Sequence, residues 1–211
     1  MPVFKSGRSA APAWCELESF DIVRLTPGQS HNFPRVGKKE KLILGGGSCK
    51  ISFEGKTVEA AEGANLDLTQ ADSQFRVGEV TAPTVLIRMT GRWGDQVGGS
   101  GLFGVANMTK PADGGDKVTY RKATGFDNHF HDCDEYWIVY EGRGVAVSEG
   151  KSFEVGTGDC IATGMGHHHD FPLVHEPVKA VYFETTMEGA KRGGHLWTHT
   201  HGPANPVKER V

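Results

Sequence analysis

The chain has 211 residues, enough for one large domain or for two small ones that each bury a core. Its 23 lysines and arginines are balanced by 26 aspartates and glutamates, so it lacks the basic surplus that holds nucleic acid. The longest apolar runs, such as Val85-Leu86-Ile87, are far shorter than the roughly 20 residues of a membrane helix. We therefore expect no nucleic-acid partner and no membrane partner.

The first residues contain no apolar stretch of the kind found in a secretory signal, which predicts a cytoplasmic protein. Four cysteines form no CxxC pair, so reduced thiols are the simpler interpretation and disulfides the alternative. The 29 glycines and 10 prolines indicate many turns, which favours an all-β fold.

Short segments rich in β-branched and aromatic residues, each closed by glycine, predict antiparallel strands and few helices. In chain order the first three are KLILGG from Lys41, KISFEG from Lys50 and KTVEAAEG from Lys56. A second set follows much later: WIVYEG from Trp137, GVAVSEG from Gly144 and KSFEVG from Lys151.

The two sets are copies of one unit. A shift of 95 residues lays 39–66 over 134–161 without a gap, and glycines coincide at Gly47 and Gly142, Gly55 and Gly150, and Gly63 and Gly158. Because glycine marks turns that need special backbone conformations, the turns themselves are repeated. We predict two units, residues 15–92 and 100–190, joined by a Gly-rich connector and followed by a tail, 191–211. Chance self-similarity of β-rich sequence is the alternative.

The second unit contains residues suited to metal chemistry. Alternate side chains of a strand share a face, so His129 and His131 project to the same side. Glu135 follows four residues later, close enough to bring a carboxylate to the same ion. A Gly-rich turn further on leads into three histidines, residues 167–169, one of which a neighbouring strand could supply as a fourth ligand.

This pattern resembles the two motifs of the cupin superfamily. The first motif, HxH, three residues, Glu, six residues and Gly, is matched by His129, His131, Glu135 and Gly142. The second, Gly, five residues and PxGxxH, is matched by Gly158, Gly166 and His169, with Gly164 in place of the proline. The resemblance implies two tandem cupin (jelly-roll) β-barrels. It also implies one divalent transition metal ion, Fe, Mn, Ni, Co or Zn, bound by His129, His131, Glu135 and His169.

The first half matches the fold but not the ligands. Where the repeat alignment places His129, His131 and His169, it finds Pro34, Val36 and Gln74, and only Glu40 is retained. As in degenerate halves of bicupins, we expect this barrel to be structural and without metal ligands, with a metal-free ligand pocket as the alternative.

Three residues near the motifs are candidates for contact with a substrate. Trp137 has the strand parity of Glu135, so we expect it on the inner face, either as a pocket wall that binds substrate or as core packing. Tyr120 and Lys122 alternate within residues 118–125. If that segment is an inward-facing strand, Tyr120 is a catalytic candidate and Lys122 orients an anionic or hydroxylated substrate. Solvent exposure is the alternative for Lys122.

The remaining histidines and one cysteine have competing interpretations. By parity His167 shares a face with His169, where it would transfer protons or hydrogen-bond to a ligand. Cys133 has the parity of His131 and would approach the metal or be a small buried side chain. The histidines of the tail would form a second metal site, cover the barrel mouth or lie on a solvated terminus: His195, His199 and His201.

The cupin fold does not fix function. We predict a metal-dependent enzyme for a small polar hydroxy or keto compound, such as a sugar derivative, because a mixed nitrogen and oxygen site suits Lewis-acid chemistry and no nucleotide motif is present. The reaction would be an enolisation-type isomerase, epimerase or lyase reaction. The alternatives are an Fe(II)-dependent dioxygenase and a non-catalytic metal- or sugar-binding sensor. Pairing of barrels across sheet edges allows a homodimer.

Overall fold

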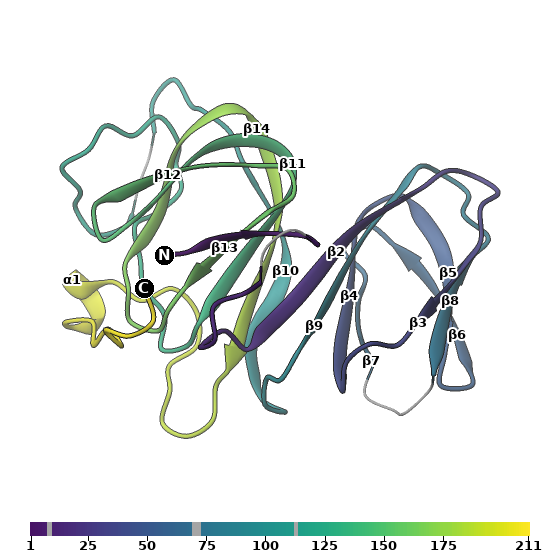
Figure 1. Cartoon of the computed structure of the whole chain (residues 1–211). Coiled ribbons are helices and arrows are strands. Elements are labelled where there is room, and N and C mark those ends of the chain that lie inside the picture. Colours follow the sequence, from purple (N-terminus) through teal and green to yellow (C-terminus); the bar gives the residue numbers. More distant parts are fainter. Residues whose placement is uncertain (8–9, 69–72, 112–113) are drawn as a thin grey trace. The chain divides into compact units, whose positions relative to one another are not determined.

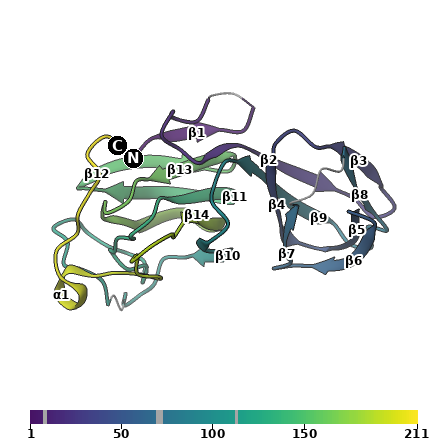
Figure 2. The ribbon, with the colours of Figure 1, turned by 90° about the horizontal axis from the view of Figure 1, so that it is seen from below.

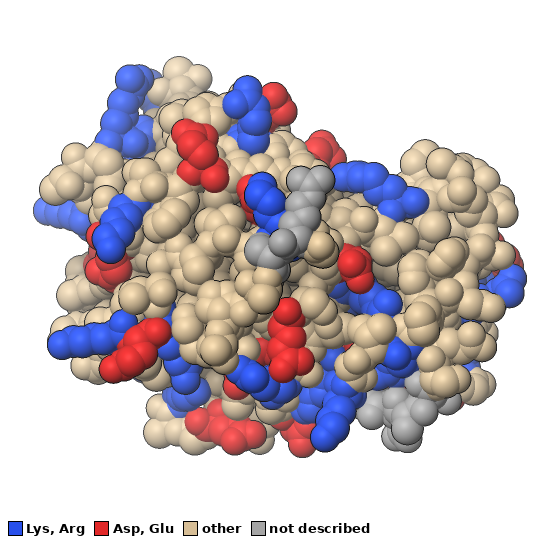
Figure 3. All heavy atoms as spheres, in the orientation of Figure 1, with Lys and Arg blue, Asp and Glu red and all other residues tan. Residues whose placement is uncertain are grey.

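The structure is a computed structural model that describes residues 1–7, 10–68, 73–111 and 114–211. It confirms the expected all-β fold, since antiparallel strands make up nearly all of its regular structure. Within these described residues, no helix is long and apolar enough to cross a membrane. Charged side chains of both signs are interspersed over the face seen in Figure 3.

The chain divides into two compact units. The N-terminal unit comprises Ser6–Ala11 and Glu16–Trp93, and the C-terminal unit comprises Met1–Lys5, Pro12–Cys15 and Gly94–Val211. The first strand of the chain, β1 (Val3–Lys5), therefore belongs to the C-terminal unit, where it pairs with β13 (Asp159–Thr163).

Two four-stranded sheets enclose the core of the N-terminal unit (Figure 1). One sheet has the order β2-β9-β4-β7, with bounds Leu17–Leu25, Thr84–Gly91, Lys39–Gly46 and Asn65–Leu68. The other has the order β3-β8-β5-β6, with bounds His31–Pro34, Gln74–Gly78, Ser48–Phe53 and Lys56–Ala61. In β5 the buried side chains alternate with half-buried ones, which is the period-two pattern that the sequence predicted.

The C-terminal unit is built around two long strands, β11 (Glu135–Ser148) and β14 (His169–Thr186), shown in Figures 1 and 2. They pair from Glu135 opposite Glu184 to Ser148 opposite His169, with several register shifts that allow the strands to curve. The sheet order is β1-β13-β11-β14-β10, with β10 at Val97–Val105 and β12 (Lys151–Gly156) paired to β11. A short helix, α1 (Thr198–His201), lies near the end of the chain.

Strand pairing shows that the repeat is structural. Four pairs between β4 and β7, beginning with Glu40 opposite Leu68, recur 95 residues later between β11 and β13, beginning with Glu135 opposite Thr163. Six pairs between β5 and β6 recur in the same way between β11 and β12. In the last strand of each unit the offset becomes 94, because Glu40 faces Thr90 whereas Glu135 faces Glu184.

The repeated turns also share one steric constraint. Gly142 has φ +81°, and a Cβ atom on it would lie 2.0 Å from the carbonyl oxygen of Pro177. Its counterpart Gly47, also at φ +81°, would place a Cβ atom 2.4 Å from the carbonyl oxygen of Pro83. Only glycine fits where the two chain segments approach so closely.

We predict that Gly142→Ala destabilises the protein by about 3 kcal/mol or more, because it combines an unfavourable φ with a backbone clash. The control is Gly150→Ala, which has φ +75° but open space around the new Cβ atom, so it should cost only about 1–2 kcal/mol. Urea unfolding of both variants measures the difference. Equal losses would show that the close approach to Pro177 is not a constraint.

Candidate metal centre

The first two histidines of the motif are placed by backbone pairing with other segments. The backbone N–H groups of His129 and His169 each donate to the other's carbonyl oxygen, at 3.2 and 2.9 Å. Phe130 makes the same exchange with Leu196, at 3.0 Å in both directions. Because the chain is extended here, His129 and His131 point to one side, as the sequence predicted, and Phe130 points to the other.

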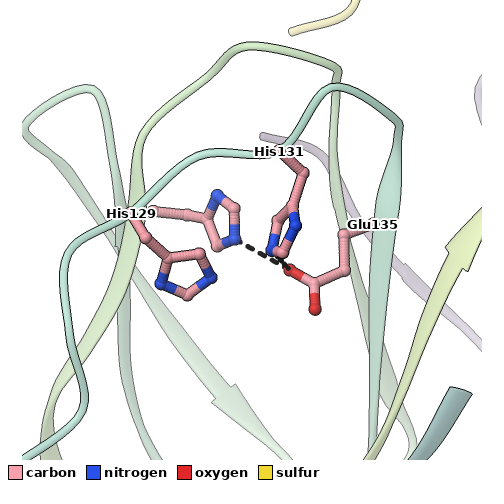
Figure 4. Close-up of side chains that lie close together, drawn as sticks. His129, His131 and Glu135 are labelled. Atoms are coloured by element: carbon pink, nitrogen blue, oxygen red, sulfur yellow. Dashed lines mark hydrogen bonds and ion pairs between the residues drawn. The ribbon is translucent and has the colours of Figure 1, made fainter. Parts of the chain in front are cut away.

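The other two members begin the two long strands: Glu135 is the first residue of β11 and His169 the first of β14. Figure 4 shows the imidazole rings gathered beside the Glu135 carboxylate. Nε2 of His169 lies 2.8 Å from Oε2 of Glu135, and Nε2 of His131 lies 3.4 Å from the same oxygen. All four residues are buried, with ligand atoms within 4.8 Å of one another: His129, His131, Glu135 and His169.

The rings of His129 and His169 turn their Nδ1 atoms toward the backbone and their Nε2 atoms toward the space beside Glu135. Nδ1 of His129 lies 2.9 Å from the carbonyl oxygen of Asp127, and Nδ1 of His169 lies 2.9 Å from that of His167. A carbonyl oxygen only accepts, so the Nδ1 atoms of His129 and His169 carry a proton, and Nε2 of His129 keeps a lone pair, whereas Nε2 of His169 is paired with the Glu135 carboxylate. Nε2 of His129 and Nε2 of His131 are buried without a hydrogen-bond partner. Buried nitrogens in this state fit a bound metal ion.

The electrostatics agree with this geometry. Burial and the neighbouring His169 hold the pKa of His129 well below its usual range, so its ring is neutral and able to ligate. Burial alone would raise the pKa of Glu135, but His131 and His169 outweigh it and hold that pKa well below its usual range. The pKa of His131 is raised, because Glu135 and Glu184 overcome the effect of burial. A cation in the centre would compete with the proton on His131.

Trp137 lies beside the centre. Its ring centroid is 5.1 Å from that of His169, in an edge-to-face arrangement, and it also contacts Phe103 and Phe126. The expected inner-face position is therefore observed, within an aromatic wall that continues into the core.

Tyr120 and Lys122 are placed differently from expectation. Residues 118–125 do not form an inward-facing strand, and the predicted solvent exposure of Lys122 is wrong. The Lys122 side chain is only 9% exposed, and its Nζ lies 2.7 Å from Oδ2 of Asp170. The Tyr120 hydroxyl donates to the same oxygen at 2.9 Å. Asp170 is fully buried and was missed in the sequence, where no spacing relates it to residues some 50 positions earlier.

His167 does not share the face of His169. It precedes β14, in a turn, where Nε2 lies 3.0 Å from the carbonyl oxygen of Val207 and Nδ1 lies 3.7 Å from Glu149. Its backbone carbonyl, rather than its ring, contacts His169. His168 points elsewhere, with Nε2 2.9 Å from Oδ2 of Asp116.

A second carboxylate lies at the centre and was not found in the sequence. Oε1 of Glu184, on β14, is 3.7 Å from Nδ1 of His131. Glu184, His131 and Cys133 form another buried group whose ligand atoms lie within 4.8 Å of one another. Burial and nearby carboxylates raise the pKa of the free Cys133 thiol, which keeps it protonated. Glu184 corresponds to Thr90 of the N-terminal unit, which faces Glu40 as Glu184 faces Glu135. An alignment of the two units matches these positions only if it allows the one-residue shift in β14.

The tail also reaches the centre. The His195 ring stacks on that of His129, with centroids 3.7 Å apart and planes 3° from parallel. Oδ2 of Asp127 lies 2.9 Å from Nδ1 of His195 and accepts from the Trp197 indole at 2.8 Å. Most tail side chains are exposed, as for the solvated terminus we considered, but the segment is attached to the barrel rather than free. The sequence offered His195 as a second metal site or a cover of the barrel mouth, but Asp127 was missed, because its contact with His195 joins positions 68 residues apart.

In the N-terminal unit the corresponding carboxylate has a different environment. Oε1 of Glu40 accepts the backbone N–H groups of Val36 and Gly37 and lies 3.1 Å from Nε of Arg35. Oε2 lies 3.0 Å from Nε of Arg88. Pro34 and Gln74, the counterparts of His129 and His169, are paired across the sheet just as those histidines are. Guanidinium groups of the chain itself thus neutralise Glu40.

We predict that Glu40→Ala destabilises the protein by about 3–5 kcal/mol in urea unfolding, because it leaves buried arginine charge uncompensated. Burial would raise the pKa of Glu40, but backbone hydrogen bonds and Arg88 outweigh it and lower that pKa. The stabilisation by Glu40 is therefore fully present above its unfolded-state pKa and is lost as the pH falls through its folded-state pKa. The stability difference between wild type and Glu40→Gln should therefore shrink below about pH 4.

The control for this prediction is Glu18→Ala, which removes an exposed pair with Arg92 at 3.5 Å and should cost less than about 1 kcal/mol. A loss of the same size in Glu18→Ala and Glu40→Ala would contradict the assigned role of Glu40.

Comparison with known proteins places this geometry in context. No family model matches the chain. The uncharacterized protein y4oW of Sinorhizobium fredii is 47% identical over 212 residues, which covers 100% of this chain and 97% of that protein.

Among solved structures, an IolB-like protein from Salmonella typhimurium is similar with a TM-score of 0.56 and 12% identity, over 94% of this chain and 97% of that one. YhaK from Escherichia coli has a TM-score of 0.56 and 15% identity, over 88% and 93% of the two chains. A Cupin 2 conserved barrel domain protein from Leptotrichia buccalis has a TM-score of 0.41 and 16% identity, over 79% and 82%. At these identities the likeness concerns the fold alone.

Proposed function

Because the chain belongs to the family of the Sinorhizobium fredii protein y4oW and has the cupin fold, we propose that it is a metal-dependent bicupin enzyme. Its C-terminal barrel would bind one divalent transition metal ion. The substrate would be a small polar hydroxy or keto compound, converted by enolisation-type isomerase, epimerase or lyase chemistry.

The observation that carries the proposal is the set of lone pairs directed at one buried space. The four ligand side chains are at most 4% exposed, yet Nε2 of His129 and Nε2 of His131 have no hydrogen-bond partner. Buried polar atoms in native proteins are nearly always satisfied, so an ion is the simplest partner for them. Three imidazoles and one carboxylate suit Fe, Mn, Ni, Co and Zn.

A bound metal of this kind supplies Lewis-acid chemistry, polarising a carbonyl oxygen of the substrate. The chain's own groups then orient the substrate and move its proton. Trp137 and Phe126 provide an apolar wall that limits the substrate to a small molecule. The two residues predicted to transfer protons are engaged elsewhere: the Tyr120 hydroxyl is hydrogen-bonded to Asp170, and the His167 ring to the carbonyl oxygen of Val207. Glu184, in contrast, lies 3.7 Å from the ring of His131. We therefore add Glu184 to the candidates for that role.

A second candidate function is a non-catalytic metal-binding protein. The observation that favours it is the burial of all four ligands, because a catalytic metal site keeps an open position whereas a structural or storage site is closed. An Fe(II)-dependent dioxygenase is the alternative within enzymes, since it uses a similar ligand set. Oxygen uptake by iron-loaded protein with candidate diketones separates it from oxygen-independent enolisation.

We predict that protein purified without an affinity tag or added metal contains about one equivalent of a divalent transition metal. The His169→Ala variant should lose this metal, because it lacks one of the three histidine ligands and the geometry of the site is broken. Elemental analysis by mass spectrometry measures both. The matched control is His31→Ala, which removes an exposed histidine of β3 and should leave the metal content unchanged. Metal retained at full stoichiometry in His169→Ala would disprove the ligand assignment, and half the loading in His31→Ala would reveal a site in the N-terminal unit.

A further inference from the structure

The segment 192–201, which we name the strap, crosses the C-terminal unit next to the histidine centre. It is attached at its start by Arg192, whose Nε and Nη2 donate to the two oxygens of Asp132 at 2.7 and 3.0 Å. Leu196, buried at its middle, exchanges backbone hydrogen bonds with Phe130. Near its end the backbone N–H groups of Thr198 and His199 donate to Asp116, at 2.6 and 3.2 Å.

Between these attachments the strap contacts two of the four ligand rings. His195 stacks on His129, and its ring also meets the ring of His131 edge to face, with centroids 5.4 Å apart. The His195 side chain is 41% exposed, whereas His129 beneath it is fully buried. On this side of the centre, the strap is therefore the layer between the ligands and solvent.

The ligand histidines differ in what orients them. His129 and His169 each use a carbonyl oxygen two residues earlier in their own chain segment. His131 is held differently: its Nδ1 lies 3.7 Å from Oε1 of Glu184, and its ring meets that of His195, more than sixty residues later, edge to face. Partners outside the ligand set direct a ligating ring, so the orientation of His131 depends on Glu184 and on the strap being in place.

The residues that lead into the strap are suited to movement. Residues 188–192 are exposed, and Gly189 and Gly194 have φ values of +85° and +79°. A Cβ atom on either glycine would meet no other atom within 4 Å, so the chain around both is loosely packed. Exposed segments that contain loosely packed glycines open at low cost in free energy.

We propose that the strap is the movable cover of the histidine centre: closed, it orients His131 and shields the ligands, and on release it admits the metal ion and a small-molecule substrate. This rests on the proposed function, because it assigns the access route of that same site. It also accounts for four ligands that are buried in a site proposed to be catalytic.

Two variants weaken the strap without changing a ligand. Arg192→Ala removes the paired contact with Asp132, and its matched control is Arg143→Ala, which removes an exposed pair with Glu176 at 2.9 Å. His195→Ala removes the stack on His129, and its matched control is His175→Ala, an exposed histidine 3.0 Å from Glu154. Using two variants keeps the test valid if one of them fails to fold.

The first readout needs no metal. Cys133 is 3% exposed, follows Asp132 directly and belongs to the buried group that it forms with His131 and Glu184. In metal-free protein, a thiol reagent should modify Cys133 about three to ten times faster in both strap variants than in wild type, the effect expected from losing one anchoring contact on local opening. The controls should match wild type, and Cys133→Ser assigns the signal.

The second readout is the rate at which cobalt-loaded protein loses Co²⁺ to a chelator, followed by its visible absorption. The strap variants should lose the ion about 10–100 times faster, because a freed His131 binds less firmly. If Cys133 is modified at the wild-type rate in both strap variants, the proposal is overturned, whatever the metal does. If wild type holds no cobalt but the variants expose Cys133, the strap is confirmed as a cover and the proposed metal function fails.

Discussion

The C-terminal unit depends on one constraint: imidazole nitrogens without hydrogen-bond partners have to be kept together in a buried space. Leaving such atoms buried and unpaired is costly, so the surrounding backbone has to hold them where an ion can satisfy them. The reciprocal backbone hydrogen bonds between His129 and His169 do this, because they fix two ligand-bearing segments at the mouth of the barrel. The long strands β11 and β14 then supply Glu135 and His169 as their first residues, and their side chains meet at 2.8 Å although they stand at the two ends of the strand pairing.

The two units show how one framework supports different electrostatics. Strand register is shared at an offset of 95 residues, and the carboxylates of Glu40 and Glu135 occupy equivalent positions. Around Glu135 the chain places imidazole rings, which fit the exchangeable ion that we propose for this unit. Around Glu40 it supplies positive charge permanently, through Arg88 and Arg35. A covalently attached cation cannot be exchanged, so the N-terminal unit has a fixed ion pair at the equivalent position.

Much of this was predictable because it depends on local patterns. Strand periodicity, the repeated glycines and the motif spacing gave the all-β fold and brought together the four residues that the structure places within one cluster. The errors concern contacts between distant segments. Lys122 was predicted to orient a substrate, with solvent exposure as the alternative, because nothing nearby in the sequence indicates its contact with Asp170. The stack of His195 on His129 likewise joins the tail to a distant segment. Glu184 was hidden by a single-residue change of offset between β9 and β14, which a gap-free alignment cannot show.

The pairing of β1 with β13 has a consequence for how the chain is put together. Val3 faces Ile161, so the C-terminal sheet includes a strand that is synthesised before the N-terminal unit. That strand can pair with β13 only after the whole N-terminal unit has been synthesised. Contacts of such large sequence separation form late and slowly. The N-terminal unit is in effect inserted into the sequence of the C-terminal unit. A fragment that begins at residue 94 would lack β1, so the edge of β13 would be unpaired and open to association with other chains.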